Sequence, residues 1–160
     1  MQQLIRKLGL QTHPEGGYFL ETDRDTRRVP NPFQNSGQKG GEDLTRSAST
    51  TIFYLITPGN PKGVFHVNKA RTVHTLHRGR GRYVLIHVDE KEGGKNARIE
   101  TFVVGQDVHV GERLQWIVEG GVYKASYLLP DTEGTRESEG MLISEVSKAP
   151  FQTVFNLYLD

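Results

Sequence analysis

The sequence contains no cysteine, and this absence excludes several classes of protein. A chain without cysteine has no disulfide framework, no thiolate nucleophile and no cysteine-ligated zinc or iron–sulfur site. No apolar run approaches the ~18 residues that a membrane-spanning helix needs. Residues 1–7 also lack the apolar stretch of a signal peptide. We therefore expect a cytoplasmic protein with no membrane partner.

An excess of charge of one sign is also missing. The 20 lysines and arginines are balanced by 19 aspartates and glutamates, for a formal net charge of +1 at pH 7. Nothing therefore draws the whole chain toward nucleic acid, and we predict no nucleic-acid partner. A local basic cluster runs from Arg71 to Arg82, with an Arg-Gly alternation at residues 78–82. It fits a solvated turn first, an anion site second and a nucleic-acid contact third.

Helix-forming sequence is scarce in this chain. Leu4, Ile5 and Leu8 would share one face of a short N-terminal helix, which Gly9 is placed to end. Residues 22–46 are polar and contain several prolines and glycines, so they predict a long loop or flap. The 18 glycines and seven prolines of the whole chain point the same way, toward a protein with little helix.

Runs of β-forming residues recur from residue 49 to the end of the sequence. They cover residues 49–56, 82–88, 99–104, 114–118, 122–129, 141–143 and 154–159. Glycines in the breaks between them suit tight antiparallel connections. The pattern predicts an all-β sandwich or barrel, with residues 1–160 forming one domain.

Strand alternation then indicates which polar side chains would line a barrel interior. If His66 points inward, Asn68 shares its face, and Thr72 and His74 follow after a turn. His74 and His77 have opposite parity, and the nearest carboxylates downstream come only at residues 89–90. A histidine metal site is therefore less favoured than ordinary hydrogen-bonded histidines. Phosphate loops, nucleophile elbows and His-Glu-x-x-His helices are absent from the sequence.

Two segments carry a resemblance to a known family. Residues 13–18 read His-Pro-Glu-Gly-Gly-Tyr, and residues 46–56 read Arg-Ser-Ala-Ser-Thr-Thr-Ile-Phe-Tyr-Leu-Ile. Weaker matches lie at residues 114–115, 120–123 and 149–151. Together they resemble the cupin-5 family of small cupins over nearly the whole chain. The resemblance implies a double-stranded β-helix, which is a jelly-roll barrel, usually paired as a homodimer.

The metal-binding motifs of cupins are only partly retained. The first motif, which asks for two histidines and a glutamate, falls on His66, Asn68 and Thr72. The histidine of the second motif falls on Lys124. An amide and a hydroxyl are poor ligands for zinc, iron or copper, and an ammonium group repels a cation. We therefore predict no cofactor and a pocket that has gained positive charge.

These residues define a candidate site for a small anionic or carbonyl-bearing ligand. The predicted catalytic residues are His66, His74 and Lys124. The predicted substrate-binding residues are Tyr18, Asn68, Thr72, Gln115 and Tyr123.

Three functions remain open for such a site. The first is a metal-free enzyme of the isomerase, epimerase, lyase or cyclase type, in which His66 or His74 is the general base and Lys124 stabilises an enolate or carboxylate. The second is a ligand-binding or storage-like cupin without turnover. The third is a metal-dependent cupin with unorthodox ligands drawn from His66, His74 and His77.

Overall fold

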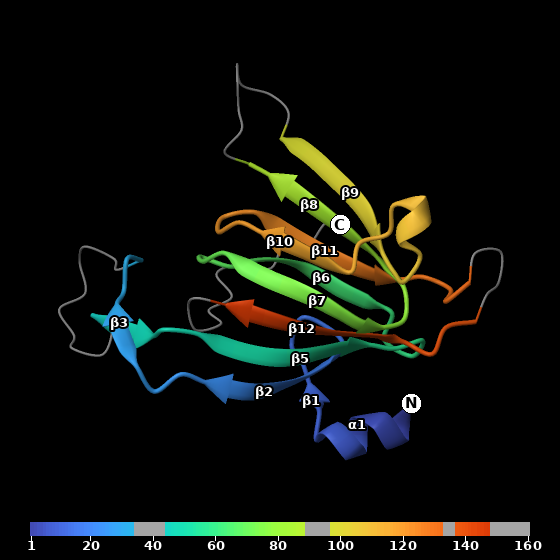
Figure 1. The fold of residues 1–160 in the computed structure, drawn as a ribbon, viewed down its shortest axis with the longest axis horizontal. Helices are drawn as coiled ribbons and strands as arrows, with labels where there is room; N and C mark the ends of the chain where they lie inside the picture. Colours follow the sequence, from blue (N-terminus) through green and yellow to red (C-terminus); the bar gives the residue numbers. More distant parts are fainter. Residues whose placement is uncertain (34–43, 89–96, 133–136, 148–160) are drawn as a thin grey trace.

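Two antiparallel sheets make up most of the protein (Figure 1). The computed structural model describes residues 1–33, 44–88, 97–132 and 137–147. The six-stranded sheet has the order β1 (Gln11–Thr12), β2 (Tyr18–Arg24), β5 (Thr50–Ile56), β12 (Met141–Ser147), β7 (Thr72–Arg78), β10 (Gln115–Val118). The four-stranded sheet has the order β6 (Lys62–Val67), β11 (Tyr123–Leu128), β8 (Gly81–His87), β9 (Arg98–Val104). A small sheet pairs β3 (Arg28–Pro30) with β4 (Thr45–Ser47).

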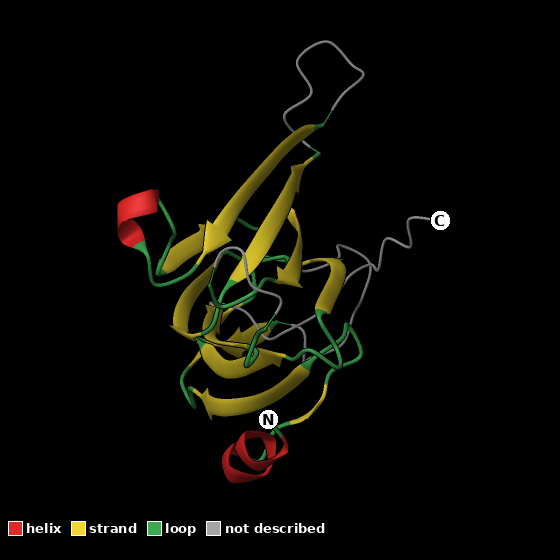
Figure 2. Ribbon diagram, turned by 90° about the vertical axis from the view of Figure 1, so that its right-hand side faces the viewer, coloured by secondary structure: helices red, strands yellow, loops and turns green. Residues whose placement is uncertain are grey.

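The N-terminal helix α1 (Gln2–Leu8) lies outside the six-stranded sheet (Figure 2). It ends at Gly9, whose N–H donates to the carbonyl oxygen of Arg6 at 3.3 Å. A short 3₁₀ helix, η1 (Val108–Val110), follows β9. Within the described part of the chain, neither element has the length and apolar character needed to cross a membrane. The all-β jelly-roll prediction with a short N-terminal helix is confirmed.

Strand β5 shows why the predicted run at residues 49–56 is apolar almost throughout. Ile52, Tyr54 and Ile56 belong to the main core between the sheets. Phe53 and Leu55 point the other way, into a second cluster that Ile5 and other residues of α1 help to cover. Because both faces of β5 are covered, neither set of alternating positions needs to be polar.

The interior between the sheets divides into two halves of different chemistry. The apolar half is lined by Ile56, Leu76, Val104, Met141 and Ile143. The polar half is lined by Thr72, His74, Lys124, Glu145 and Ser147, all of which are buried. Strands β7 and β12 each run through both halves, so each changes from apolar to polar side chains along its inner face.

The predicted loop at residues 22–46 is partly wrong. The end of β2, together with β3 and β4, falls in this segment, and Val29 is the register partner of Arg46. The strands escaped prediction because they are largely exposed and therefore polar, as the burial of β2 shows. Residues 34–43 and the predicted strand at residues 154–159 lie outside the described residues. The single-domain organisation stays a prediction.

Candidate functional site

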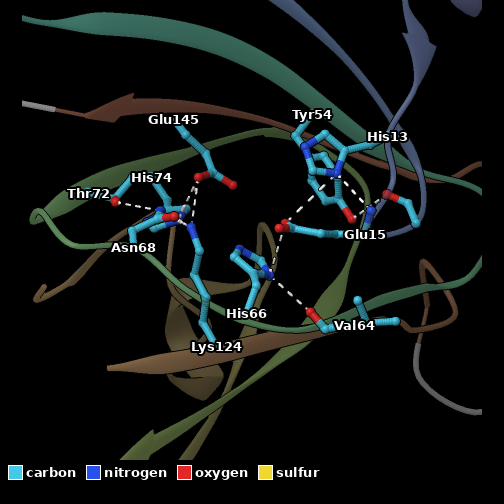
Figure 3. A network of polar contacts seen from close by, with 11 residues as sticks. His13, Glu15, Tyr54, Val64, His66, Asn68, Thr72, His74, Lys124 and Glu145 are labelled. Carbon is cyan, nitrogen blue, oxygen red and sulfur yellow. Dashed lines mark hydrogen bonds and ion pairs between the residues drawn. The ribbon is translucent and has the colours of Figure 1, made fainter. Parts of the chain in front are cut away.

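Strand register sets the positions of the buried polar side chains. In the six-stranded sheet, His74 on β7 is paired with Glu145 on β12 and with Trp116 on β10. In the four-stranded sheet, Lys124 on β11 is paired with His66 on β6. The two sheets face each other across the polar half, where Lys124 from one sheet contacts His74 and Glu145 from the other (Figure 3).

Lys124 joins the two sheets. Its Nζ lies 2.8 Å from Nε2 of His74 and 2.8 Å from Oε2 of Glu145. The same two acceptor atoms are 3.3 Å apart. The exposed fractions of Lys124, His74 and Glu145 are 2%, 0% and 4%, so this ion pair is closed to solvent. We call these three residues the Lys124 triad.

The triad fixes the protonation states of its members. Burial by itself would raise the pKa of Glu145, but the Lys124 ammonium and then His74 hold it well below its usual value. Burial, followed by the charge of Lys124, lowers the pKa of His74, so the ring is neutral at pH 7. The ammonium therefore donates to Nε2 of His74, and the ring proton is assigned to Nδ1.

Aromatic rings hold the imidazole of His74 in place. The indole of Trp116 stacks on it with centroids 5.1 Å apart and planes 10° apart. The ring of Tyr83 meets its edge at 5.7 Å. Nδ1 of His74 and Nε1 of Trp116 have no hydrogen-bond partner among the described residues. His74 is thus packed as part of the core.

The motif at residues 13–18 forms a tight loop between β1 and β2. The N–H of His13 donates to Gly17 O at 3.0 Å, and the Tyr54 hydroxyl donates to Gly16 O at 3.0 Å. Gly16 and Gly17 have φ of 91° and 72°, which favour glycine. A Cβ on Gly17 would lie 2.6 Å from the Leu55 carbonyl oxygen. The two glycines therefore let the loop press against β5 and carry Glu15 inward.

Glu15 meets His66 at the inner side of this loop. Its Oε2 lies 3.3 Å from Nδ1 of His66 and 3.8 Å from Nδ1 of His13. Nδ1 of His66 is also 2.9 Å from the Val64 carbonyl oxygen. Because a carbonyl oxygen only accepts, we assign the ring proton of neutral His66 to Nδ1. Its Nε2 is then an unprotonated base, and no polar contact between described residues engages it.

His66 differs from His74 in its access to solvent. The His66 side chain is 15% exposed and that of Glu15 is 7% exposed. Burial, and next the charge of Lys124, lowers the pKa of His66, so this ring is also neutral at pH 7. We call His66 and Glu15 the Glu15 pair.

Asn68 and Thr72 complete the network. The Asn68 amide donates to Oγ1 of Thr72 at 3.1 Å, and the Thr72 hydroxyl donates to the Ala70 carbonyl oxygen at 3.4 Å. Both side chains are buried. Within the described part of the chain, Oδ1 of Asn68 has no hydrogen-bond partner. It is a buried acceptor left available in the polar half.

The structure brings together five of the eight residues that the sequence suggested. These are His66, Asn68, Thr72, His74 and Lys124 (Figure 3).

The other three lie elsewhere. Gln115 is exposed and donates to Thr75 Oγ1 at 3.2 Å, because its neighbour Trp116 takes the inward position on β10. Tyr18 packs with the cluster beneath α1. Tyr123 is half-buried and precedes the inward Lys124 on β11, so alternation turns it to the other face.

Sequence reasoning missed three residues of the polar half: Glu15, Glu145 and Trp116. Glu15 lies inside the motif at residues 13–18, so the motif itself was the available signal. Glu145 extends the inward alternation of Met141 and Ile143 by one more position, beyond the end of the predicted strand. The expectation of a cationic pocket is wrong, because Glu145 pairs with Lys124.

The residues present do not fit a cupin metal. Two of the expected ligand positions are Asn68 and Thr72, which hydrogen-bond to each other, and a third is the Lys124 ammonium. No group of three or more His, Cys, Asp or Glu among the residues described is arranged to hold a metal ion. No step of the chemistry below is therefore assigned to a metal.

Three surface hollows of the described residues lie away from this network. They are lined by residues such as Lys7, Arg80 and Pro130, and none of these three includes a member of the Lys124 triad or the Glu15 pair. The case for a site between the sheets therefore depends on its polar groups.

The fold and the altered ligand positions define a divergent cupin. The chain belongs to the Cupin superfamily (DUF985) family, whose model matches residues 2–154. It is similar to the uncharacterized protein YML079W of Saccharomyces cerevisiae, with 47% identity over 148 residues, which are 91% of this chain and 68% of the yeast protein.

Solved structures show the same fold. A hypothetical protein from Leishmania major is 29% identical with a TM-score of 0.74, covering 91% of this chain and 79% of the other. Protein SO0799 from Shewanella oneidensis is 21% identical with a TM-score of 0.69, covering 94% and 78% respectively. A shared fold does not fix an activity, so function has to be argued from the site.

Proposed function

We propose that this cupin is a metal-independent acid–base enzyme that moves a proton on a carbon next to the carbonyl group of a small polar molecule. Isomerisation and epimerisation are the reactions that such a step serves most directly, and elimination or cyclisation can follow from it. The Glu15 pair carries the proposal, because it presents Nε2 of a neutral histidine as a base.

His66 is a better general base than His74 on two counts. Its contacts engage Nδ1 and leave Nε2 available, whereas Nε2 of His74 accepts from Lys124. Its side chain is 15% exposed, and that of His74 is fully buried. The Glu15 carboxyl group orients the ring and would stabilise the imidazolium that forms after proton abstraction.

Lys124 is the group placed to stabilise the enolate. An ammonium group has three protons, and the recorded contacts of Lys124 within the described residues use two of them. Lys124 is also the register partner of His66 on the adjacent strand. A carbonyl oxygen that accepts the third proton would place the neighbouring carbon within the reach of His66.

The charges in the polar half favour an uncharged substrate. Lys124 is paired with Glu145, and Glu15 adds a second carboxyl group beside His66. No excess positive charge is therefore left among these groups to bind a carboxylate or phosphate. Of the two ligand classes that the sequence left open, anionic and carbonyl-bearing, an uncharged carbonyl compound such as a polyhydroxy aldehyde or ketone suits these groups better.

Hydrogen–deuterium exchange at carbon tests the proposal. The wild-type protein is incubated in D₂O with a panel of aldoses, ketoses and hydroxyketones, and the signals of protons next to the carbonyl are followed by NMR. We expect one member to lose its signal with wild-type protein and to keep it with His66→Gln. His77→Gln is the matched control, because His77 is exposed and packs on Phe53 outside the core. Equal exchange by wild type and His66→Gln would contradict the assignment.

Ligand binding without turnover is the second candidate. The Lys124 triad favours this candidate, because its buried ion pair has a structural role that does not require Lys124 to take part in a reaction. In the same experiment, saturable line broadening without exchange would select this function.

We further propose a cytoplasmic homodimer. The dimer follows from the family resemblance, and light scattering of the wild-type protein would test it, with a monomeric mass as the contrary result.

A further inference from the structure

We propose that the ammonium of Lys124 is a built-in cation, held by His74 and Glu145 in the position that a metal ion would otherwise take between them. This inference goes beyond the proposed function and does not depend on turnover. It concerns which cation the polar half contains, and the evidence is the geometry and the burial of the triad.

The first argument is the spacing of the two acceptor atoms. Nε2 of His74 and Oε2 of Glu145 lie 3.3 Å apart. Two ligand atoms bound to one tetrahedral zinc at about 2.1 Å are separated by about 3.4 Å. The pair is thus spaced as two ligands of one ion are spaced. Nζ of Lys124 is 2.8 Å from both atoms, as a hydrogen-bonded cation would be.

The second argument is the protonation state of the two acceptors. A metal site needs an ionised carboxylate and a neutral imidazole with a free lone pair. Because the ammonium of Lys124 donates to both atoms, Nε2 of His74 and Oε2 of Glu145 each present a lone pair to the same cation. The lone pair of His74 Nε2 is directed at Lys124 rather than at solvent.

The third argument is that Nζ of Lys124 already occupies the position between the two acceptor atoms. The side chains of Lys124, His74 and Glu145 are 2%, 0% and 6% exposed. A divalent ion would have to expel an ammonium that is covalently anchored to β11. We therefore infer that the wild-type protein takes up no metal here, and that removing Nζ opens a cation site. His66, the register partner of Lys124, is a candidate third ligand.

The experiment compares wild-type protein with Lys124→Ala, using Zn²⁺ alone and methylammonium alone as probes. Equilibrium dialysis gives the zinc content, and thermal unfolding gives Tm. We expect no change in wild type with either probe. For Lys124→Ala we expect one additional Zn²⁺ per chain and a rise in Tm of about 5 °C at saturating zinc. Methylammonium is expected to raise the Tm of this variant as well, because it restores the missing cation.

Two further variants keep the test decisive. Lys124→His preserves a nitrogen donor and is expected to gain zinc even where Lys124→Ala does not fold. Adding Glu145→Gln to either variant should abolish the gain. The inference is overturned if both single variants gain no zinc, or if wild-type protein binds one zinc that Glu145→Gln removes. Carbon exchange by wild type and His66→Gln is measured without added zinc, so either result leaves the assignment of His66 as the base standing and is distinguishable from its failure.

Discussion

The two histidines of the polar half, His66 and His74, each have a carboxylate, but the two pairs are built differently. Glu145 lies on β12 beside His74 and is locked by Lys124 from the opposite sheet. Glu15 comes from a loop, and Nε2 of its partner His66 is left without a partner among the described residues.

This difference separates a structural role from a chemical one. A carboxylate on a central strand is fixed by register on both sides, and its ion pair closes the space between the sheets. A carboxylate on a loop positions a ring without burying it completely. The Lys124 triad therefore carries stability and the Glu15 pair supplies the base, while Lys124 serves the proposed reaction only through its third proton. The predictions below address this division.

The largest effect is expected from Lys124→Met. Methionine has a similar volume, so the change removes the charge with little loss of packing and leaves Glu145 buried without its cation. Breaking a buried ion pair in this way costs about 3–5 kcal/mol. Urea unfolding would measure the loss. Glu139→Gln is the control, because its partner Arg78 is exposed and a surface pair contributes about 0–1 kcal/mol. Equal losses in the two variants would show that the triad is not structural.

A smaller effect on stability but a clear effect on chemistry is expected from Glu15→Gln. The Glu15 charge raises the pKa of His66 against the larger lowering by burial. Its removal should therefore lower the pKa of His66 further and move the acid limb of the exchange rate to lower pH. The rate above that limb should fall by about 10- to 100-fold, less than the ~10²–10⁴-fold that a positioned general base contributes as a whole. A lower rate with an unshifted pH profile would contradict the positioning role.

The pH dependence of stability should be the most gradual of these effects. The pKa values of His66 and His74 are lowered in the folded state by burial, while in the unfolded chain they lie near 6.5. Below about pH 6.5 the unfolded chain binds protons that the folded protein does not, so stability falls as pH decreases. Urea unfolding between pH 5 and 8 would show this slope. His74→Gln should flatten it, and an unchanged slope would mean that His74 titrates normally.

Much of the fold could be predicted from the sequence, because its strands carry local signals. The apolar run of β5 and the helix stop at Gly9 both depend on neighbouring residues alone. Strand β2 gave no such signal, since an exposed strand and a loop have similar compositions.

The site could be predicted only in part, for the same reason. The predicted alternation of inward-facing side chains holds from His66 across the turn to His74, and Asn68 is buried as that alternation predicts. Glu145 meets Lys124 through pairing across the barrel, which no local pattern encodes. Polarity predicts Gln115 as the inward residue of β10, whereas the indole of Trp116 fills the inward position.

The most direct test of the division between the two pairs is a ¹⁵N NMR titration of the histidine rings from pH 5 to 8. The account predicts that both rings are neutral at pH 7 with the proton on Nδ1, and that only His66 changes its Nε2 signal when a substrate is added. His74 should keep its signals throughout, as a ring held by Lys124 and Trp116. A protonated His66 at pH 7, or a response at His74 with none at His66, would contradict the account.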